Sequence, residues 1–274
     1  MILAFELAGG SWQIDTDAAH DISIPLHFNG PQPRAFGIDA AISRPVEAGG
    51  FVGDTRRGGA CNCETVTLNP HGNGTHTECL GHVVDERVAV AAVLREPFLP
   101  AVVASVTPLN AGNGDKALEG AAVGDRVITR RALVNALEAL GSVPREFFSA
   151  LVLRTLPNDE SRLNAAYSGT NPAYLTPAAM RLIRELGVRH LLLDLPSVDR
   201  EEDDGRLAAH RIFWDLPAEG HLGPEPLEAR TITEMIFVGN HIADGCYMLN
   251  LQIPHFMLDA APSRPLLFGL IRRK

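Results

Sequence analysis

The sequence predicts a fold of the α/β class, in which strands and helices alternate along the chain. Three short apolar runs have the composition of strands that are buried on both faces of a sheet: residues 101–106, 151–153 and 190–193. Two segments between and beside these runs carry apolar residues at helical spacing. This alternation favours helices packed on a sheet.

Both predicted helices have start and stop signals. The first extends from Thr129, which can cap its amino end, to Gly141, and the second extends from Thr176 to Gly187, with Pro177 at its first position. Their apolar positions are Leu133, Leu137 and Leu140 in the first helix and Met180, Ile183 and Leu186 in the second. The Pro/Gly/Arg-rich stretch at 29–59 predicts long ordered loops.

Composition excludes several classes of protein. The 274 residues carry 24 Lys+Arg against 33 Asp+Glu, a net charge of -9, and an acidic chain without basic clusters disfavours binding to nucleic acid or to anionic membranes. The chain is 46% hydrophobic, but no apolar run approaches the roughly 18 to 20 residues of a membrane span. We therefore expect a soluble protein with a small-molecule ligand. A single domain at 1–274 is the most economical organisation, because one fold can bring distant candidate residues together.

The cysteines and the amino terminus predict a cytoplasmic location. Cys61, Cys63, Cys79 and Cys246 do not form the spaced pairs of a zinc ribbon, and we interpret them as buried thiols in a reducing compartment. The apolar stretch at the start of the chain is short and contains Glu6, which is not typical of a signal peptide.

The strongest local signal is a histidine cluster, in which three of the ten histidines lie within residues 71–82. Three glycines in this segment permit tight turns around a small ligand. If the backbone is extended, His76 and Glu78 point to the same side. Imidazoles with a carboxylate suit zinc, manganese or iron(II), so the segment predicts a metal site, with a surface loop of scattered histidines as the alternative.

A second group of candidates lies about 130 residues further on, at 210–214 and 230–238. Glu234 interrupts an otherwise apolar strand in this group. A buried carboxylate costs several kcal/mol unless a cation or a donor meets it. A metal ion and a salt bridge to an arginine would both satisfy Glu234.

At these residues the chain resembles the cyclase family of metal-dependent hydrolases, which includes bacterial kynurenine formamidases and isatin hydrolases. The family signature is His-x-Gly-Thr-His-x-Asp-x-Pro-x-His, and here residues 74–76 read Gly-Thr-His, Glu78 stands in the Asp place and His82 in the last His place. The other matching segments are Asp21-Ile22-Ser23, Leu153-Arg154-Thr155, Leu195-Pro196-Ser197-Val198-Asp199, and Pro262-Ser263-Arg264-Pro265, with His210 and Glu234 at the downstream ligand positions.

The chain departs from the family pattern at the first ligand. Gly72 occupies the place of the first histidine, and His71 lies one residue earlier. Either a one-residue bulge returns His71 to the metal or the site has one ligand fewer. Glu78 is one methylene longer than the family Asp, and Cys79-Leu80 lacks the family Pro. Extra residues at 30–60, 108–122 and 215–229 imply altered substrate selection.

The resemblance implies a swivelling β/β/α fold with a barrel-like mixed sheet and outer helices, assembled as a homodimer or tetramer. It implies one or two divalent ions, zinc or alternatively manganese. The implied ligands are His71, His76 and Glu78 for one ion and Glu78, His210 and Glu234 for a second, with His82 transferring protons as catalytic residue.

The activity implied by the resemblance is hydrolysis of a carbon-nitrogen bond in a formamide or cyclic amide, with an N-formylkynurenine-like arylformamide as the specific expectation. Lactone or cyclic-imide hydrolysis, or dehydration, on the same metal are alternatives, as is a paralogue that binds a small molecule without turnover. Candidates for an apolar pocket are Phe28, Phe36, Phe51, Phe213 and Trp214. A competing ligand set, His241 and Asp244 with His255, is set aside because the resemblance places it in a buried terminal strand.

Overall fold

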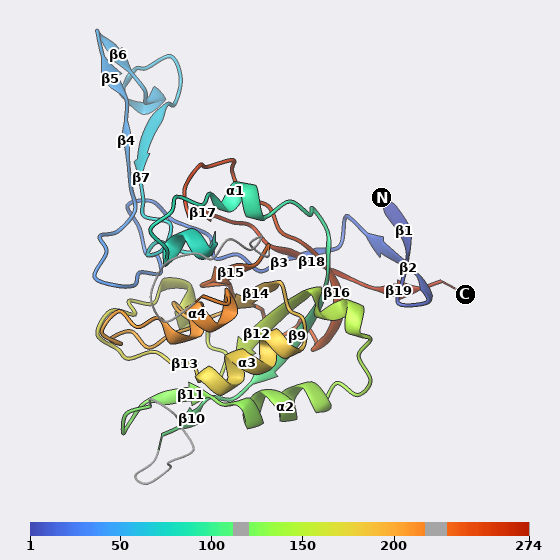
Figure 1. Ribbon diagram of the computed structural model, residues 1–274. Helices are drawn as coiled ribbons and strands as arrows, with labels where there is room; N and C mark the ends of the chain where they lie inside the picture. The colour runs from blue at the N-terminus through green and yellow to red at the C-terminus, as the bar shows by residue number, and fades with distance from the viewer. Residues whose placement is uncertain (112–120, 217–228, 274) are drawn as a thin grey trace.

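The centre of the molecule is a nine-stranded mixed sheet that curls into a half-barrel (Figure 1). The computed structural model describes residues 1–111, 121–216 and 229–273. The four middle strands run parallel in the order β15 (Thr231–Glu234), β14 (His190–Leu193), β12 (Ala150–Thr155), β9 (Leu99–Val106). Antiparallel strands flank them: β8 (His76–Glu78) and β17 (Ala260–Pro262) beside β15, and β16 (Gly245–Asn250), β18 (Leu266–Gly269) and β3 (Ala19–Asp21) beside β9. The predicted α/β class and the barrel-like mixed sheet are confirmed.

Three helices cover one face of this sheet: α2 (Arg130–Glu138), α3 (Pro177–Glu185) and α4 (Ala208–Phe213) (Figure 1). The predicted caps are in place, because Oγ1 of Thr129 accepts from the backbone N–H of Ala132 at 3.1 Å and Oγ1 of Thr176 accepts from that of Ala179 at 3.2 Å. Helices α2 and α3 are each followed by a glycine with positive φ, Gly141 at 74° and Gly187 at 84°. The start and stop signals in the sequence are confirmed.

The middle strands are buried on both faces, as their continuous apolar runs predict. Leu151 and Leu153 of β12 face the helices and pack with Met180 of α3. Ala150 and Val152 face the opposite side, in a second cluster with residues such as Ile236 that follow β15. The sheet is therefore a rigid support for side chains placed at its edge and strand ends.

The remaining elements are small. The amino-terminal hairpin β1 (Ile2–Leu7) and β2 (Gly10–Asp15) pairs with β19 (Ile271–Arg272), and β10 (Leu109–Asn110) and β13 (Tyr174–Leu175) flank β11 (Arg126–Ile128). The described residues also contain one short α-helix and four 3-10 helices: α1 (Val90–Val93), η1 (Thr55–Arg57), η2 (Leu80–His82), η3 (Arg145–Ser149) and η4 (Glu160–Asn164).

The sequence predicts long ordered loops at 29–59, but the stretch also contains strands. It forms part of an arm that extends from the body (Figure 1). In this arm β4 (Ile42–Pro45) pairs with β7 (Glu64–Thr67), and β5 (Glu47–Ala48) with β6 (Phe51–Val52) stands at the tip. All four residues of β7 are exposed. The other two extra segments of the sequence lie largely outside the described residues.

The arm also corrects the interpretation of the cysteines. Cys61 and Cys63 are exposed on it, whereas Cys79 is buried and Cys246 is half-buried, and all four are free thiols. The prediction of buried thiols is wrong for the first two because a two-stranded arm has no second layer to cover them. Within the described ranges, no helix is long and apolar enough to cross a membrane.

Candidate metal centre

Two neighbouring strands present the centre of the site. His76 and Glu78 lie on β8, both buried, and alternation places them on one side as the sequence predicts. Glu234 is the last residue of β15, and the antiparallel register sets it directly opposite His76. The strand does not continue past Glu234, because Met235 adopts a φ of +51°. The carboxylate therefore stands at a strand end and does not interrupt a strand.

His210 reaches the site from α4. Its Nε2 lies 3.0 Å from Oε1 of Glu78, although the two residues are 132 positions apart in the chain. On the other side of the ring, Nδ1 lies 2.7 Å from Oδ2 of Asp199. Asp199 also accepts from the backbone N–H groups of Ala209 and His210, at 2.7 and 3.0 Å. One carboxylate thus fixes both the start of the helix and the orientation of the imidazole.

His71 reaches the site through a turn and not through a bulge in a strand. The backbone N–H groups of Gly72 and Asn73 both donate to the carbonyl of Asn69, and Gly74 has a φ of +83°. This turn brings Nδ1 of His71 to 3.0 Å from Oε2 of Glu78.

Gly72 itself has no room for a side chain. A Cβ atom at this position would lie 2.5 Å from Cδ1 and 2.8 Å from Cβ of Ile38. A histidine at the family position is therefore excluded by packing, and His71 is the imidazole that faces the carboxylate in its place.

The environment of His76 tests whether a cation fits. Its Nδ1 lies 3.1 Å from the carbonyl of Gly74, so the ring N–H is used there and Nε2 is left as an acceptor. Nε2 is buried, has no hydrogen-bond partner among the described residues, and lies 3.5 Å from Oε2 of Glu234 and 3.9 Å from Oε2 of Glu78. Two buried carboxylate oxygens thus face this unpartnered nitrogen. Ligand atoms of His71, His76 and Glu78 lie within 4.8 Å of one another, and this set of imidazoles and carboxylate fits a divalent metal ion.

The charges of the neighbouring groups agree with this interpretation. Burial opposes ionisation of Glu78, but the imidazoles of His82, His210 and His71 hold the pKa of that carboxyl well below its usual range. Burial opposes protonation of His71, yet Asp259 and Glu78 raise the pKa of His71 to about 10. Asp199 and Glu78 raise the pKa of His210 in the same way. Without an ion, protons on His71 and His210 balance the carboxylates.

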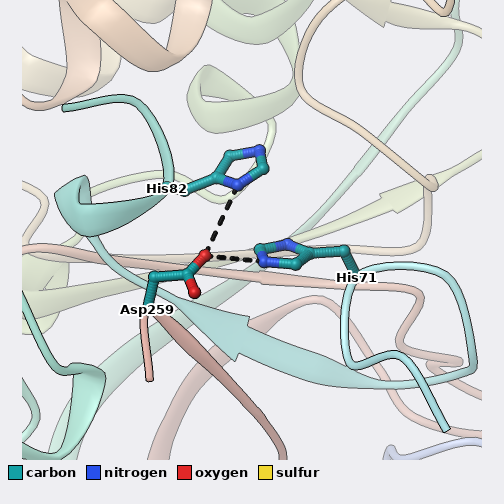
Figure 2. A group of neighbouring side chains, drawn as sticks. All are labelled: His71, His82 and Asp259. Atoms are coloured by element: carbon teal, nitrogen blue, oxygen red, sulfur yellow. Dashed lines mark hydrogen bonds and ion pairs between the residues drawn. The ribbon is translucent and has the colours of Figure 1, made fainter. Parts of the chain in front are cut away.

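His82 stands at the rim of the site, at the end of η2. Its ring stacks on that of His71 with centroids 4.2 Å apart and lies 5.6 Å from the ring of His210. Nδ1 of His82 lies 3.6 Å from Oδ2 of Asp259, and Figure 2 shows this carboxylate beside the two histidines, joined to each by a dashed line. The half-buried position leaves the ring accessible to a substrate above the buried ligands.

The structure therefore gathers in one site the six residues that the resemblance implies as metal ligands and proton-transfer residue, which are His71, His76, Glu78, His82, His210 and Glu234. Sequence reasoning missed two carboxylates, Asp199 and Asp259. Asp199 lies in a segment that matches the family, but its role was not assigned. Asp259 carried no signal, because it lies 188 residues after His71.

Other sequence candidates lie elsewhere. Phe213 is buried in the helix-facing core, whereas Phe51 is exposed at the tip of the arm (Figure 1), so the aromatic residues do not line one pocket. His241 precedes β16 in an exposed loop, and Asp244 pairs with Arg154 at 2.7 Å. The placement of this set in a buried strand is wrong, and it forms no ligand cluster among the described residues.

Comparisons with known proteins agree with the resemblance. The family described as putative cyclase matches residues 19–200. Isatin hydrolase A from Labrenzia aggregata bound to benzyl benzoate superposes with a TM-score of 0.61 at 15% identity, covering 91% of this chain and 93% of that chain. A predicted metal-dependent hydrolase from Bacillus stearothermophilus gives a TM-score of 0.54 at 14% identity, covering 91% and 97%. Isatin hydrolase A from Ralstonia solanacearum gives 0.61 at 15%, covering 92% and 91%. No curated protein sequence matches the chain.

Proposed function

The chain belongs to the putative cyclase family, and from this premise we propose that it is a metal-dependent hydrolase that cleaves the carbon-nitrogen bond of a formamide or cyclic amide. The fold it shares with metal-dependent hydrolases supports the reaction class. The observation that carries the proposal is the buried Nε2 of His76, which has no partner among the described residues and faces the carboxylates of Glu78 and Glu234. Such an arrangement is costly unless a cation occupies it.

The ion would be held by His76, Glu78, His210 and Glu234, with His71 as a further ligand through Nδ1. Zinc and manganese both suit this donor set, and the bridging position of Glu78 allows one or two ions. A bound divalent ion polarises a carbonyl and lowers the pKa of its water to roughly 7. Outer partners fix the ligands beforehand, because Asp199 holds His210 and the carbonyl of Gly74 holds His76.

His82 is the proposed catalytic residue. It stands beside the buried ligands, and a ring nitrogen lies within 4.8 Å of ligand atoms of Glu78 and His210. From there the imidazole can accept the proton of the attacking water and deliver it to the departing amine. An arylformamide resembling N-formylkynurenine is the specific substrate we propose. Similarity in fold to isatin hydrolases supports a cyclic amide as the related possibility.

Metal-free protein, reloaded with zinc or with manganese, would be assayed with an arylformamide, with isatin and with a simple lactone. We expect metal-dependent hydrolysis of an amide substrate and its loss in His76→Ala. The matched control is His241→Ala, which removes an exposed histidine outside the site. Faster turnover of the lactone would favour the alternative reaction class. Metal binding without turnover of any substrate would favour a binding paralogue.

The assembly, domain organisation and location of the chain are also proposals. We propose that the chain forms one domain over 1–274, assembles as a homodimer or tetramer and is located in the cytoplasm. We also propose that it binds neither nucleic acid nor a membrane. The exposed arm supports the assembly, because an isolated two-stranded ribbon is marginally stable in water.

A further inference from the structure

Asp259 is held against the site by its backbone. It directly precedes β17, the edge strand that pairs with β8, and its carbonyl accepts from the backbone N–H of Cys79 at 3.0 Å. The η2 turn packs closely on it, because a Cβ atom at Gly81 would lie 3.2 Å from Cβ of Asp259. The absence of a side chain at Gly81 therefore lets His82 approach this carboxylate.

A single oxygen of Asp259 meets two histidines. Oδ2 lies 2.8 Å from Nε2 of His71 and 3.6 Å from Nδ1 of His82. The two rings stack on each other, with planes inclined by only 26°, and Figure 2 shows a dashed line from the carboxylate to each of them. Both histidines hold the pKa of this carboxyl well below its usual range. Asp259 is thus an anion whose contacts fix the orientation of both rings.

The arrangement at His71 repeats the one at His210. His71 has one ring nitrogen on Asp259 and the other 3.0 Å from Oε2 of Glu78. His210 has one ring nitrogen on Asp199 and the other 3.0 Å from Oε1 of Glu78. A ligand histidine with its second N–H on a carboxylate is held in one tautomer and one ring orientation. Asp259 therefore does for His71 what Asp199 does for His210.

Asp259 does not form an ion site of its own with His71 and His82, although their ligand atoms lie within 4.8 Å of one another. The lone pair of an imidazole nitrogen lies in the plane of the ring. Two rings stacked 4.2 Å apart direct these lone pairs along nearly parallel planes, so they do not converge on one ion.

We propose that Asp259 is a positioning residue, which orients Nδ1 of His71 towards the metal ligands and holds His82 beside them through the same carboxylate oxygen. The proposal rests on the proposed function for His82, but its consequence for His71 concerns metal affinity alone. Asp259 therefore links a ligand to the proton-transfer residue in a chain that has lost the family's first ligand position.

The test compares Asp259→Asn with the parent, using Zn²⁺ affinity measured by competition with a chelating dye. Because Asp259 also raises the pKa of His71, its loss lowers the cost of displacing that proton, so affinities are compared after correction for the protons released on binding. We expect the corrected affinity to fall by about 10- to 100-fold, the range for a lost outer partner of a ligand. In a His71→Ala background the same substitution should have little further effect on affinity. Leu258→Ala is the matched control, because this exposed residue directly precedes Asp259 in the same loop.

Turnover provides the second readout. Asp259→Asn, saturated with Zn²⁺, should lower kcat with little change in KM, and the loss should shrink in a His82→Ala background. Unchanged affinity and unchanged kcat would overturn the proposal. Loss of a whole ion per chain would overturn it too, because Asp259 would then be a ligand. If the parent turns over no substrate, the hydrolase function fails, while the affinity cycle with His71 still decides the role of Asp259.

Discussion

Binding of Zn²⁺ to the metal-free protein should release protons that the neighbouring carboxylates now hold on two histidines. His71, with its pKa raised to about 10, and His210, with its pKa also raised, are protonated at pH 7.5 and must become neutral to ligate. Displacing the proton of His71 costs 1.36 kcal/mol for each pH unit below its pKa. At pH 7.5 this lowers the binding free energy of Zn²⁺ by about 3 kcal/mol, which is a few hundred-fold in affinity. The sign follows: affinity should rise with pH, and the contribution of His71 should level off as pH passes about 10.

Calorimetry at pH 7.5 in two buffers of different ionisation enthalpy counts these protons. The parent should release about one proton more than His71→Ala, since a coordinated water contributes equally to both proteins. His241→Ala should match the parent. Equal proton release from the parent and His71→Ala, with equal affinity, would refute the view that His71 exchanges its proton for the ion.

Three further outcomes test other parts of the site and fold. Glu234→Ala should remove most of the bound ion, because it deletes the carboxylate that faces the unpartnered Nε2 of His76 at 3.5 Å, and elemental analysis for metal per chain would check this; full retention would contradict the assignment. His82→Ala should keep the ion yet lower kcat by about a hundredfold, the range for a lost general acid or base, and loss of the ion instead would make His82 a ligand. Gly72→Ala should destabilise the protein by roughly 1 to 3 kcal/mol in urea unfolding, because its Cβ would meet Ile38, and Gly72→Ala in an Ile38→Ala background should recover part of this.

Much of the framework could be predicted because its signals are local. The helix caps at Thr129 and Thr176 depend on residues three positions away, and each apolar strand is readable from its own composition. His76 and Glu78 share a face because a strand alternates. The exposed arm was not predicted, because its turn-rich composition is also typical of ordered loops.

The sequence by itself determined which side chains are available for chemistry. The histidines between 71 and 82, and a carboxylate in an apolar segment at Glu234, already indicate a cation, since unpaired buried charge is too costly to be incidental.

Only the tertiary structure decided how the ligands are supported. Ile38 fills the space a side chain at Gly72 would need, which makes His71 the histidine that faces Glu78. Asp259 meets His71 across 188 residues of chain because β17 pairs with β8. Such contacts depend on strand order and side-chain packing, so they carry no periodic or local signal in the sequence.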